Sequence, residues 1–138
     1  MSSQAARVIS YTIAPEYDAA RASASPGKAI DLVYLARQSL GDKKLETELL
    51  ELYERQAAQV VDRLTSTMGS GELRWQYDLA HTLTGSSRAV GAFAVAAASE
   101  AYEAVLGSGA STDARATALQ ILQEEVDITR ASIVHLLG

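Results

Sequence analysis

The chain of 138 residues contains no cysteine, which excludes disulfide bonds, thiolate nucleophiles and cysteine-ligated zinc sites. It contains only two prolines, Pro15 and Pro26, so long helices can run without interruption. The longest nearly apolar run covers residues 89–98, whereas a membrane-spanning helix needs about 20 apolar residues. The first residues also lack the basic and apolar pattern of a secretory signal. We therefore expect a soluble, cytoplasmic protein.

Basic side chains are also few, because 12 Lys and Arg stand against 17 Asp and Glu and give a net charge of −5. No block of Lys or Arg is present of the kind that binds nucleic acid. Hydrophobic residues make up 48% of the chain, enough for one domain to bury a core without a metal or disulfides. We expect a monomer whose partners are proteins, with no nucleic acid and no membrane among its ligands.

Apolar residues recur at helical spacing, and no segment alternates as a strand does. The pattern predicts helices over residues 26–39, 42–69, 72–90, 92–106 and 112–137, with Ser25, Asp42 and Thr112 as N-caps. Because short Gly/Ser links join long helices, we predict an all-α fold, an antiparallel up-down four-helix bundle with an extra N-terminal helical segment. The predicted bundle domain covers residues 26–138, and residues 1–25 form an arm that is partly helical.

The predicted helix 72–90 has one apolar face and one polar face. A projection at 100° per residue places Ala80 and Leu83 on the core face, with His81 about 160° from Leu83. His81 is therefore expected to point into solvent from a rigid helix. The side chains expected near it are Arg74, Gly85 and Arg88 on the same arc, and Tyr77 and Thr84 at its flank.

An exposed histidine is a candidate nucleophile, because imidazole has a reference pKa of about 6.5 and is largely neutral near pH 7. A single histidine on a helix surface is nevertheless more often an ordinary polar residue. Gly85, one turn beyond His81, strengthens the case, since glycine inside a helix costs about 1 kcal/mol relative to alanine. Its presence indicates either the close approach of another molecule or tight packing against a neighbouring helix.

The segment around His81 resembles a known signature. Residues 80–92, Ala-His-Thr-Leu-Thr-Gly-Ser-Ser-Arg-Ala-Val-Gly-Ala, are similar to the motif of histidine-containing phosphotransfer (HPt) domains, in which Ala-His-x-Leu-Lys-Gly-Ser-Ser precedes a Gly-Ala pair. Downstream, Tyr102 and Glu103 fall where the family has a Leu-Glu pair. Upstream, Gly41 and Asp42 resemble the family's Gly-x-Asp turn. The resemblance covers about residues 30–106.

This resemblance implies a four-helix bundle that carries phosphate and is not a turnover enzyme. His81 would be the phosphoacceptor in a two-component phosphorelay, exchanging phosphoryl groups with the aspartates of response-regulator receiver domains or with a hybrid histidine kinase. Gly85 would provide clearance for the partner. The helical projection, independently of the resemblance, adds Arg74 and Tyr77 to the expected binding surface. The carrier itself would need no cofactor, because Mg²⁺ in such transfers belongs to the receiver domain.

One departure from the family motif affects the predicted chemistry. The family has lysine where this chain has Thr84, and threonine can donate a hydrogen bond but carries no charge. Arg88 or Arg74 would then supply the positive field, since a guanidinium suits phosphate oxygens. The alternative is a phosphate-independent regulator that docks on a kinase or receiver domain through the same helical face.

Three further predictions concern residues outside the motif. His135 is expected near the end of the last helix as a surface residue, and no metal site is expected, because the two histidines lack ligand spacing. Trp75 is expected to pack within the bundle, with a place in a partner-binding rim as the alternative. The glutamates of the second long helix are expected to form a solvated surface: Glu46, Glu48, Glu51 and Glu54.

Overall fold

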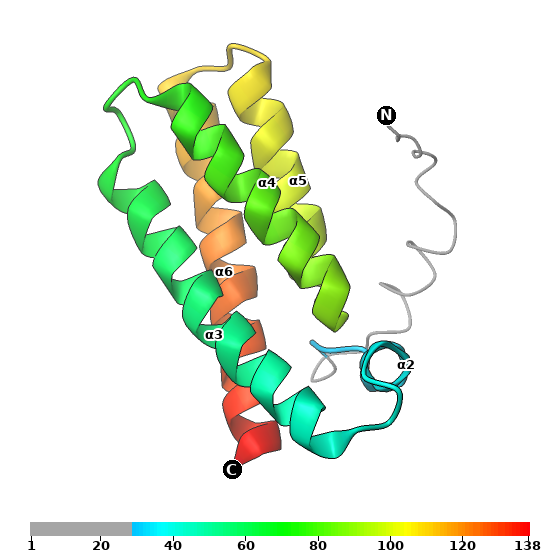
Figure 1. Ribbon diagram of the computed structural model, residues 1–138. Coiled ribbons are helices and arrows are strands. Elements are labelled where there is room, and N and C mark those ends of the chain that lie inside the picture. Colours follow the sequence, from blue (N-terminus) through cyan, green and yellow to red (C-terminus); the bar gives the residue numbers. More distant parts are fainter. Residues whose placement is uncertain (1–28) are drawn as a thin grey trace.

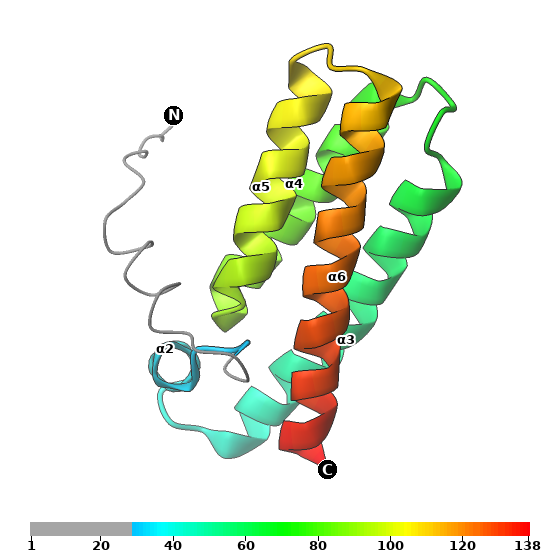
Figure 2. The same ribbon diagram turned by 180° about the vertical axis from the view of Figure 1, so that it is seen from behind.

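The computed structural model describes residues 29–138, so the predicted arm, residues 1–25, lies outside the described part of the chain. The described residues form helices α2 (Leu32–Gln38), α3 (Lys43–Ser66), α4 (Leu73–Val90), α5 (Phe93–Gly107) and α6 (Thr112–Leu137), with no strand among them. Figures 1 and 2 show α3 to α6 as an antiparallel up-down bundle, with α2 across the end where α3 begins. The predicted fold class is confirmed.

The first described helix begins later than predicted. The expected start at Pro26 is wrong, because residues 29–31 are not helical and α2 begins at Leu32. The N-cap is Asp31, whose carboxylate accepts the backbone N–H of Tyr34 at 2.9 Å. The N–H of Asp31 in turn donates to the carbonyl of Gly91 at 2.9 Å. The residue that caps α2 is thus also bonded to the α4–α5 turn. The spacing of residues in the sequence does not reveal this contact.

Helices α3 and α6 begin at side-chain caps, whereas α4 and α5 have no side-chain cap hydrogen bond. Asp42 caps α3 as predicted, accepting the N–H of Leu45 at 3.1 Å. The cap of α6 is one residue earlier than predicted, because Ser111 rather than Thr112 accepts the N–H of Ala114, also at 3.1 Å. Both Ser and Thr are good capping residues, so their order in the sequence does not distinguish them.

The core lies along the axis of the bundle, and each of the four long helices packs against two of the others, with α2 contacting α3 and α4 as well. Helix α5 packs between α4 and α6. No helix within residues 29–138 is both long and apolar enough to cross a membrane. The largest fully buried apolar side chains are Leu35, Leu64, Leu83, Val95, Tyr102, Leu122, Val126 and Ile133.

Small side chains bring α4 and α5 close together. Ala80 of α4 and Ser99 of α5 are both fully buried, and the Ser99 hydroxyl donates to the carbonyl of Ala80 at 2.7 Å. Because Ala80 directly precedes His81, this hydrogen bond attaches the centre of α4 to α5 at the histidine. Glu103, one turn beyond Ser99, is consequently carried toward the same part of α4.

The α4–α5 turn depends on Gly91. Its φ of +82° is left-handed, and a Cβ built on it would lie 3.0 Å from the carbonyl oxygen of Asp31. A left-handed conformation costs a non-glycine residue roughly 1–2 kcal/mol, and the close oxygen adds a steric term. Glycine at position 91 therefore meets two requirements. It adopts the left-handed conformation of the turn, and it leaves room for the backbone of Asp31, just before α2.

We expect Gly91→Ala to lower the free energy of unfolding by at least about 1–2 kcal/mol, because the backbone strain cannot be relieved without moving α2. Urea denaturation followed by circular dichroism measures this change. The matched control is Gly85→Ala, where an added Cβ meets nothing within 4 Å and helix propensity should raise stability by up to about 1 kcal/mol. Equal stability of the two variants would contradict this account of the turn.

Candidate functional site

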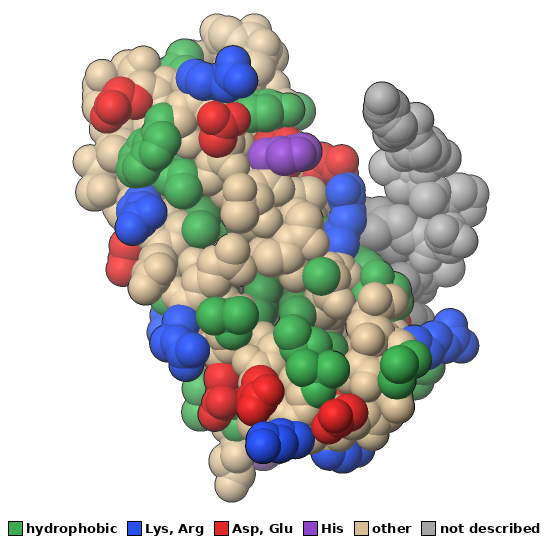
Figure 3. All heavy atoms as spheres, viewed as in Figure 1, with side chains coloured by type: hydrophobic (Ala, Val, Ile, Leu, Met, Phe, Trp, Pro, Cys, Tyr) green, Lys and Arg blue, Asp and Glu red, His purple; other side chains and the backbone are tan. Residues whose placement is uncertain are grey.

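His81 lies in the middle of α4 on the outer surface of the bundle, with 71% of its side chain exposed. Figure 3 shows a histidine side chain on the face presented by α4, with acidic and basic side chains beside it. Ala80 and Leu83 are fully buried. The predicted division of this helix into a core face and a face carrying His81 is therefore confirmed.

The imidazole of His81 is held by a carboxylate from α5. Its Nδ1 lies 3.0 Å from Oε1 of Glu103, and Glu103 is only 7% exposed. Because an ionised carboxylate only accepts hydrogen bonds, Nδ1 is the atom that carries the proton in this pair. Nε2 is then left with its lone pair, the arrangement that a nucleophilic imidazole requires.

Thr84 is not where the projection placed it. It was predicted at the flank of the exposed face, but it is 2% exposed and faces α5. Its hydroxyl donates to Oε2 of Glu103 at 2.5 Å, with the carbonyl of Ala80 as a second acceptor at 3.0 Å. The two oxygens of Glu103 are thus divided between Thr84 and His81, and Thr84 does not point to the surface where a phosphate would bind.

Tyr77 lies against His81, one helical turn earlier on α4. The two rings are nearly parallel, with an interplanar angle of 7° and centroids 6.0 Å apart. Burial raises the pKa of the Tyr77 phenol, and the nearby Glu103 carboxylate raises it further. The phenol therefore keeps its proton through the physiological pH range, and Tyr77 borders both members of the His81–Glu103 pair.

The two predicted arginines are already paired with carboxylates. Nη2 of Arg88 lies 3.0 Å from Oε2 of Glu100 on α5, and both side chains are about half exposed. Nε of Arg74 lies 3.4 Å from Oδ1 of Asp78, one turn along α4. Each arginine is seven residues from His81, which is about 10 Å along the helix axis. The structure groups His81 with Tyr77 and, through Glu103, with Thr84, and it records no contact between His81 and either arginine.

Gly85 lies on the surface of α4 one turn beyond His81, and a Cβ built there meets nothing within 4 Å. Packing against a neighbouring helix therefore does not explain this glycine. Clearance for another molecule, the other reason that the sequence left open, stays a prediction.

Glu103 is the functional candidate that sequence reasoning did not assign to the site. Its side chain lies 22 positions from His81 on a different helix, so no local spacing connects the two. A signal was available, because Glu103 stands four residues after Ser99 on an alanine-rich helix, among positions expected to be buried. A charged residue on such a face needs a partner, since an unpaired buried charge is costly.

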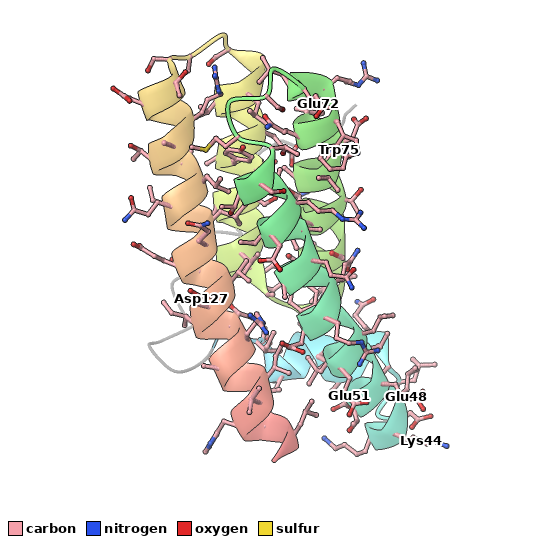
Figure 4. All side chains as sticks on the ribbon, turned by 90° about the vertical axis from the view of Figure 1, so that its left-hand side faces the viewer. Lys44, Glu48, Glu51, Glu72, Trp75 and Asp127 are labelled. Carbon is pink, nitrogen blue, oxygen red and sulfur yellow. The ribbon has the colours of Figure 1, made fainter. Side chains whose placement is uncertain are left out.

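Other sequence predictions have mixed outcomes. Trp75, near the beginning of α4 (Figure 4), is 40% exposed rather than packed inside the bundle. His135 is exposed as predicted. No group of three or more His, Asp or Glu side chains within residues 29–138 is arranged to hold a metal ion.

The predicted solvated surface of α3 is correct only in part. Glu48 and Glu51 are exposed, and Figure 4 shows them on α3, with Asp127 on the neighbouring α6. Glu46 is instead buried, and its carboxylate accepts the hydroxyl of Ser39 at 3.0 Å. The packing of α2 against α3 accounts for this burial, and the sequence pattern of polar and apolar residues within α3 does not.

Comparisons with known proteins identify a sequence family and a similar fold. The sequence model of the family described as Hpt domain matches residues 48–132, from α3 to α6. Among solved structures, the fold is similar to that of a rice protein described as a histidine-containing phosphotransfer protein, with a TM-score of 0.72. The two chains are 19% identical, and the match covers 88% of this chain and 90% of the rice chain; at this identity the likeness shows the fold alone. A search of curated proteins gave no match.

We expect Thr84→Val to lower the free energy of unfolding by about 1–3 kcal/mol, because one oxygen of the buried Glu103 loses its donor. The ring of His81 should also become less firmly held, since Glu103 is then free to rotate. Urea denaturation measures the first effect, and ¹⁵N shifts of the His81 ring measure the second. Thr84→Ser keeps the hydroxyl and should restore most of both; a valine variant identical to wild type would refute the role given to this hydrogen bond.

Proposed function

The chain belongs to the Hpt domain family, and from this premise we propose that it is a phosphocarrier that accepts a phosphoryl group on Nε2 of His81. Its proposed partners are response-regulator receiver domains, a hybrid histidine kinase, or both. The observation that carries the proposal is the geometry of His81, an exposed imidazole whose Nδ1 is hydrogen-bonded to a buried carboxylate. Among the residues described, this arrangement leaves Nε2 directed away from Glu103 and accessible to a partner.

The proposed transfer needs no proton movement at the attacking atom. The lone pair of Nε2 attacks the phosphorus of an aspartyl phosphate, a nitrogen–phosphorus bond forms, and the aspartyl oxygen–phosphorus bond breaks to release a carboxylate. The imidazole keeps its Nδ1–H and becomes cationic, so the Glu103 carboxylate at 3.0 Å stabilises the phosphorylated ring. The reverse reaction returns the phosphoryl group to a second receiver. Mg²⁺, in this proposal, belongs to the acidic pocket of the receiver.

Arg88 is the proposed source of positive charge from this chain. Its ion pair with Glu100 is about half exposed, and surface pairs of this kind contribute only about 0–1 kcal/mol. The guanidinium can therefore leave Glu100 at small cost when a phosphoryl group, or the acidic rim of a receiver, approaches the surface of α4. Arginine's planar fork then offers two parallel hydrogen bonds to phosphate oxygens.

A second function is favoured by one specific observation. The position where the family has lysine is occupied by Thr84, whose hydroxyl faces inward to Glu103. A phosphate-independent regulator would dock on a kinase or receiver through the same α4 surface without needing a cation there. The phosphocarrier is the better account, because docking alone would not require the buried carboxylate behind His81.

We expect His81→Gln to abolish phosphorylation of this chain while the helical signal in circular dichroism stays unchanged. An exposed residue contributes little to folding, and the glutamine amide can still donate a hydrogen bond to Glu103. The measurement is incubation with phosphorylated receiver domains, scoring acid-labile and base-stable label on the chain.

His135→Gln is the matched control, because the chain has only two histidines, and this variant should label as wild type does. Binding of receivers should survive His81→Gln. If wild type accepts no phosphate from cognate donors, yet binds receivers as well as His81→Gln does, the phosphocarrier is refuted and the regulator replaces it.

The exposed Gly85 yields a separate prediction about docking. Gly85→Gln should reduce transfer from a receiver by about tenfold or more, equivalent to about 1.4 kcal/mol, because the side chain projects into the space that the partner would fill. Phosphoramidate, a small phosphodonor that needs no docking, should label this variant at the wild-type rate. An equal loss with both donors would mean that the substitution disturbs His81 itself rather than the docking surface.

A further inference from the structure

Tyr77 is the neighbour of His81 that neither the core nor the docking geometry explains. It is not part of the buried core and is 37% exposed. Its ring nevertheless lies nearly parallel to the imidazole, at 7°, with centroids 6.0 Å apart. This is within the range of offset-stacked aromatic pairs. The two side chains are four residues apart on α4, the spacing at which side chains on one helix face meet.

The hydrogen bond from Nδ1 to Glu103 does not by itself fix the ring. The torsion that turns an imidazole about its Cβ–Cγ bond has broad energy minima, so the ring of His81 can tilt while the hydrogen bond survives. A ring stacked on one face restricts that tilt. Tyr77, one turn away on the same helix, supplies this second constraint on the direction of Nε2.

Tyr77 also borders the carboxylate that holds the histidine. Glu103 is almost completely buried although its partner His81 is largely exposed, so groups other than the imidazole must cover it. The Tyr77 ring lies beside the imidazole that bonds this carboxylate, and burial together with the nearby Glu103 raises the pKa of its phenol. Excluding water strengthens the hydrogen bond between His81 and Glu103, because electrostatic attraction is stronger in a less polar environment.

We propose that Tyr77 is a positioning residue for phosphoryl transfer, which holds the His81 ring by stacking and shields the hydrogen bond between His81 and Glu103. The proposal rests on the phosphocarrier function and deepens it. Nitrogen–phosphorus bond formation requires the Nε2 lone pair to point along the line of attack, so a ring held in one orientation reacts faster than a tilting one.

The test compares Tyr77→Leu, which removes the aromatic ring, with Tyr77→Phe, which keeps the stack and removes the hydroxyl. Trp75→Leu is the matched control, because Trp75 is an aromatic residue of similar exposure on the same helix and lies about 120° around the helix from His81. Two readouts are used on the full chain. The first is the ¹⁵N spectrum of the His81 ring, with the His135 signal identified in His135→Gln. The second is labelling by phosphoramidate and by a phosphorylated receiver.

For Tyr77→Leu we expect ring nitrogen signals that move toward a mixture of tautomers, and a maximal labelling rate about three- to tenfold lower with both donors. The receiver concentration for half-maximal rate should change little. Tyr77→Phe should recover most of the rate, and Trp75→Leu should match wild type. Circular dichroism melting identifies any variant that fails to fold. If Tyr77→Leu does not fold, Tyr77→Phe still shows how far the hydroxyl, as distinct from the stacked ring, is required.

Two outcomes would overturn the proposal. Wild-type ring signals and maximal rate in a folded Tyr77→Leu would show that the stack holds nothing. A change confined to the half-maximal receiver concentration would make Tyr77 a docking contact. Failure of the proposed function gives a different result, because wild type would then accept phosphate from neither donor. The ring spectrum alone would in that case decide whether Tyr77 positions the imidazole.

Discussion

The site depends on the hydrogen bonds made by the buried carboxylate of Glu103. A buried carboxylate is tolerated only when hydrogen bonds satisfy its oxygens, and here His81 and Thr84 take one oxygen each. The requirement acts in both directions. The bonds that make Glu103 acceptable inside the bundle are the same bonds that fix the tautomer and the direction of the His81 imidazole.

That carboxylate reaches His81 because α4 and α5 approach closely. Ala80 and Ser99 are fully buried where these helices meet, and the Ser99 hydroxyl donates to the carbonyl of Ala80 at 2.7 Å. Larger side chains at these positions would separate the helices and withdraw Glu103 from the histidine. Packing that would ordinarily be assigned to stability therefore positions Glu103 at His81, and Gly91, which closes the α4–α5 turn, contributes to the same geometry.

Helical periodicity was sufficient to predict four long helices, the up-down bundle and an exposed His81, because these features depend on residues close in the sequence. It was insufficient for Thr84. The projection places this residue at the edge of the polar face, and whether an edge residue is buried depends on where the neighbouring helix lies, which is a tertiary property. The predicted start of α2 was wrong for the same reason, because the backbone N–H of Asp31 donates to the carbonyl of Gly91, a residue far away in the sequence. Glu103 was missed because its partner is on another helix.

The inward orientation of Thr84 changes what its departure from the family motif means. A lysine on this backbone would begin beside Glu103, where its ammonium would meet the carboxylate before it reached a phosphate on Nε2. Threonine satisfies the carboxylate without competing for it through charge, so Glu103 remains available to the cationic ring. In the proposed phosphocarrier, the charge from this chain that neutralises phosphate then comes from a different position. In the described structure Arg88 is suited to this task, because its weak surface pair with Glu100 can be exchanged for a phosphate at small cost. In this proposal Glu103 and Thr84 hold the histidine, and a separate residue, Arg88, attracts the phosphate.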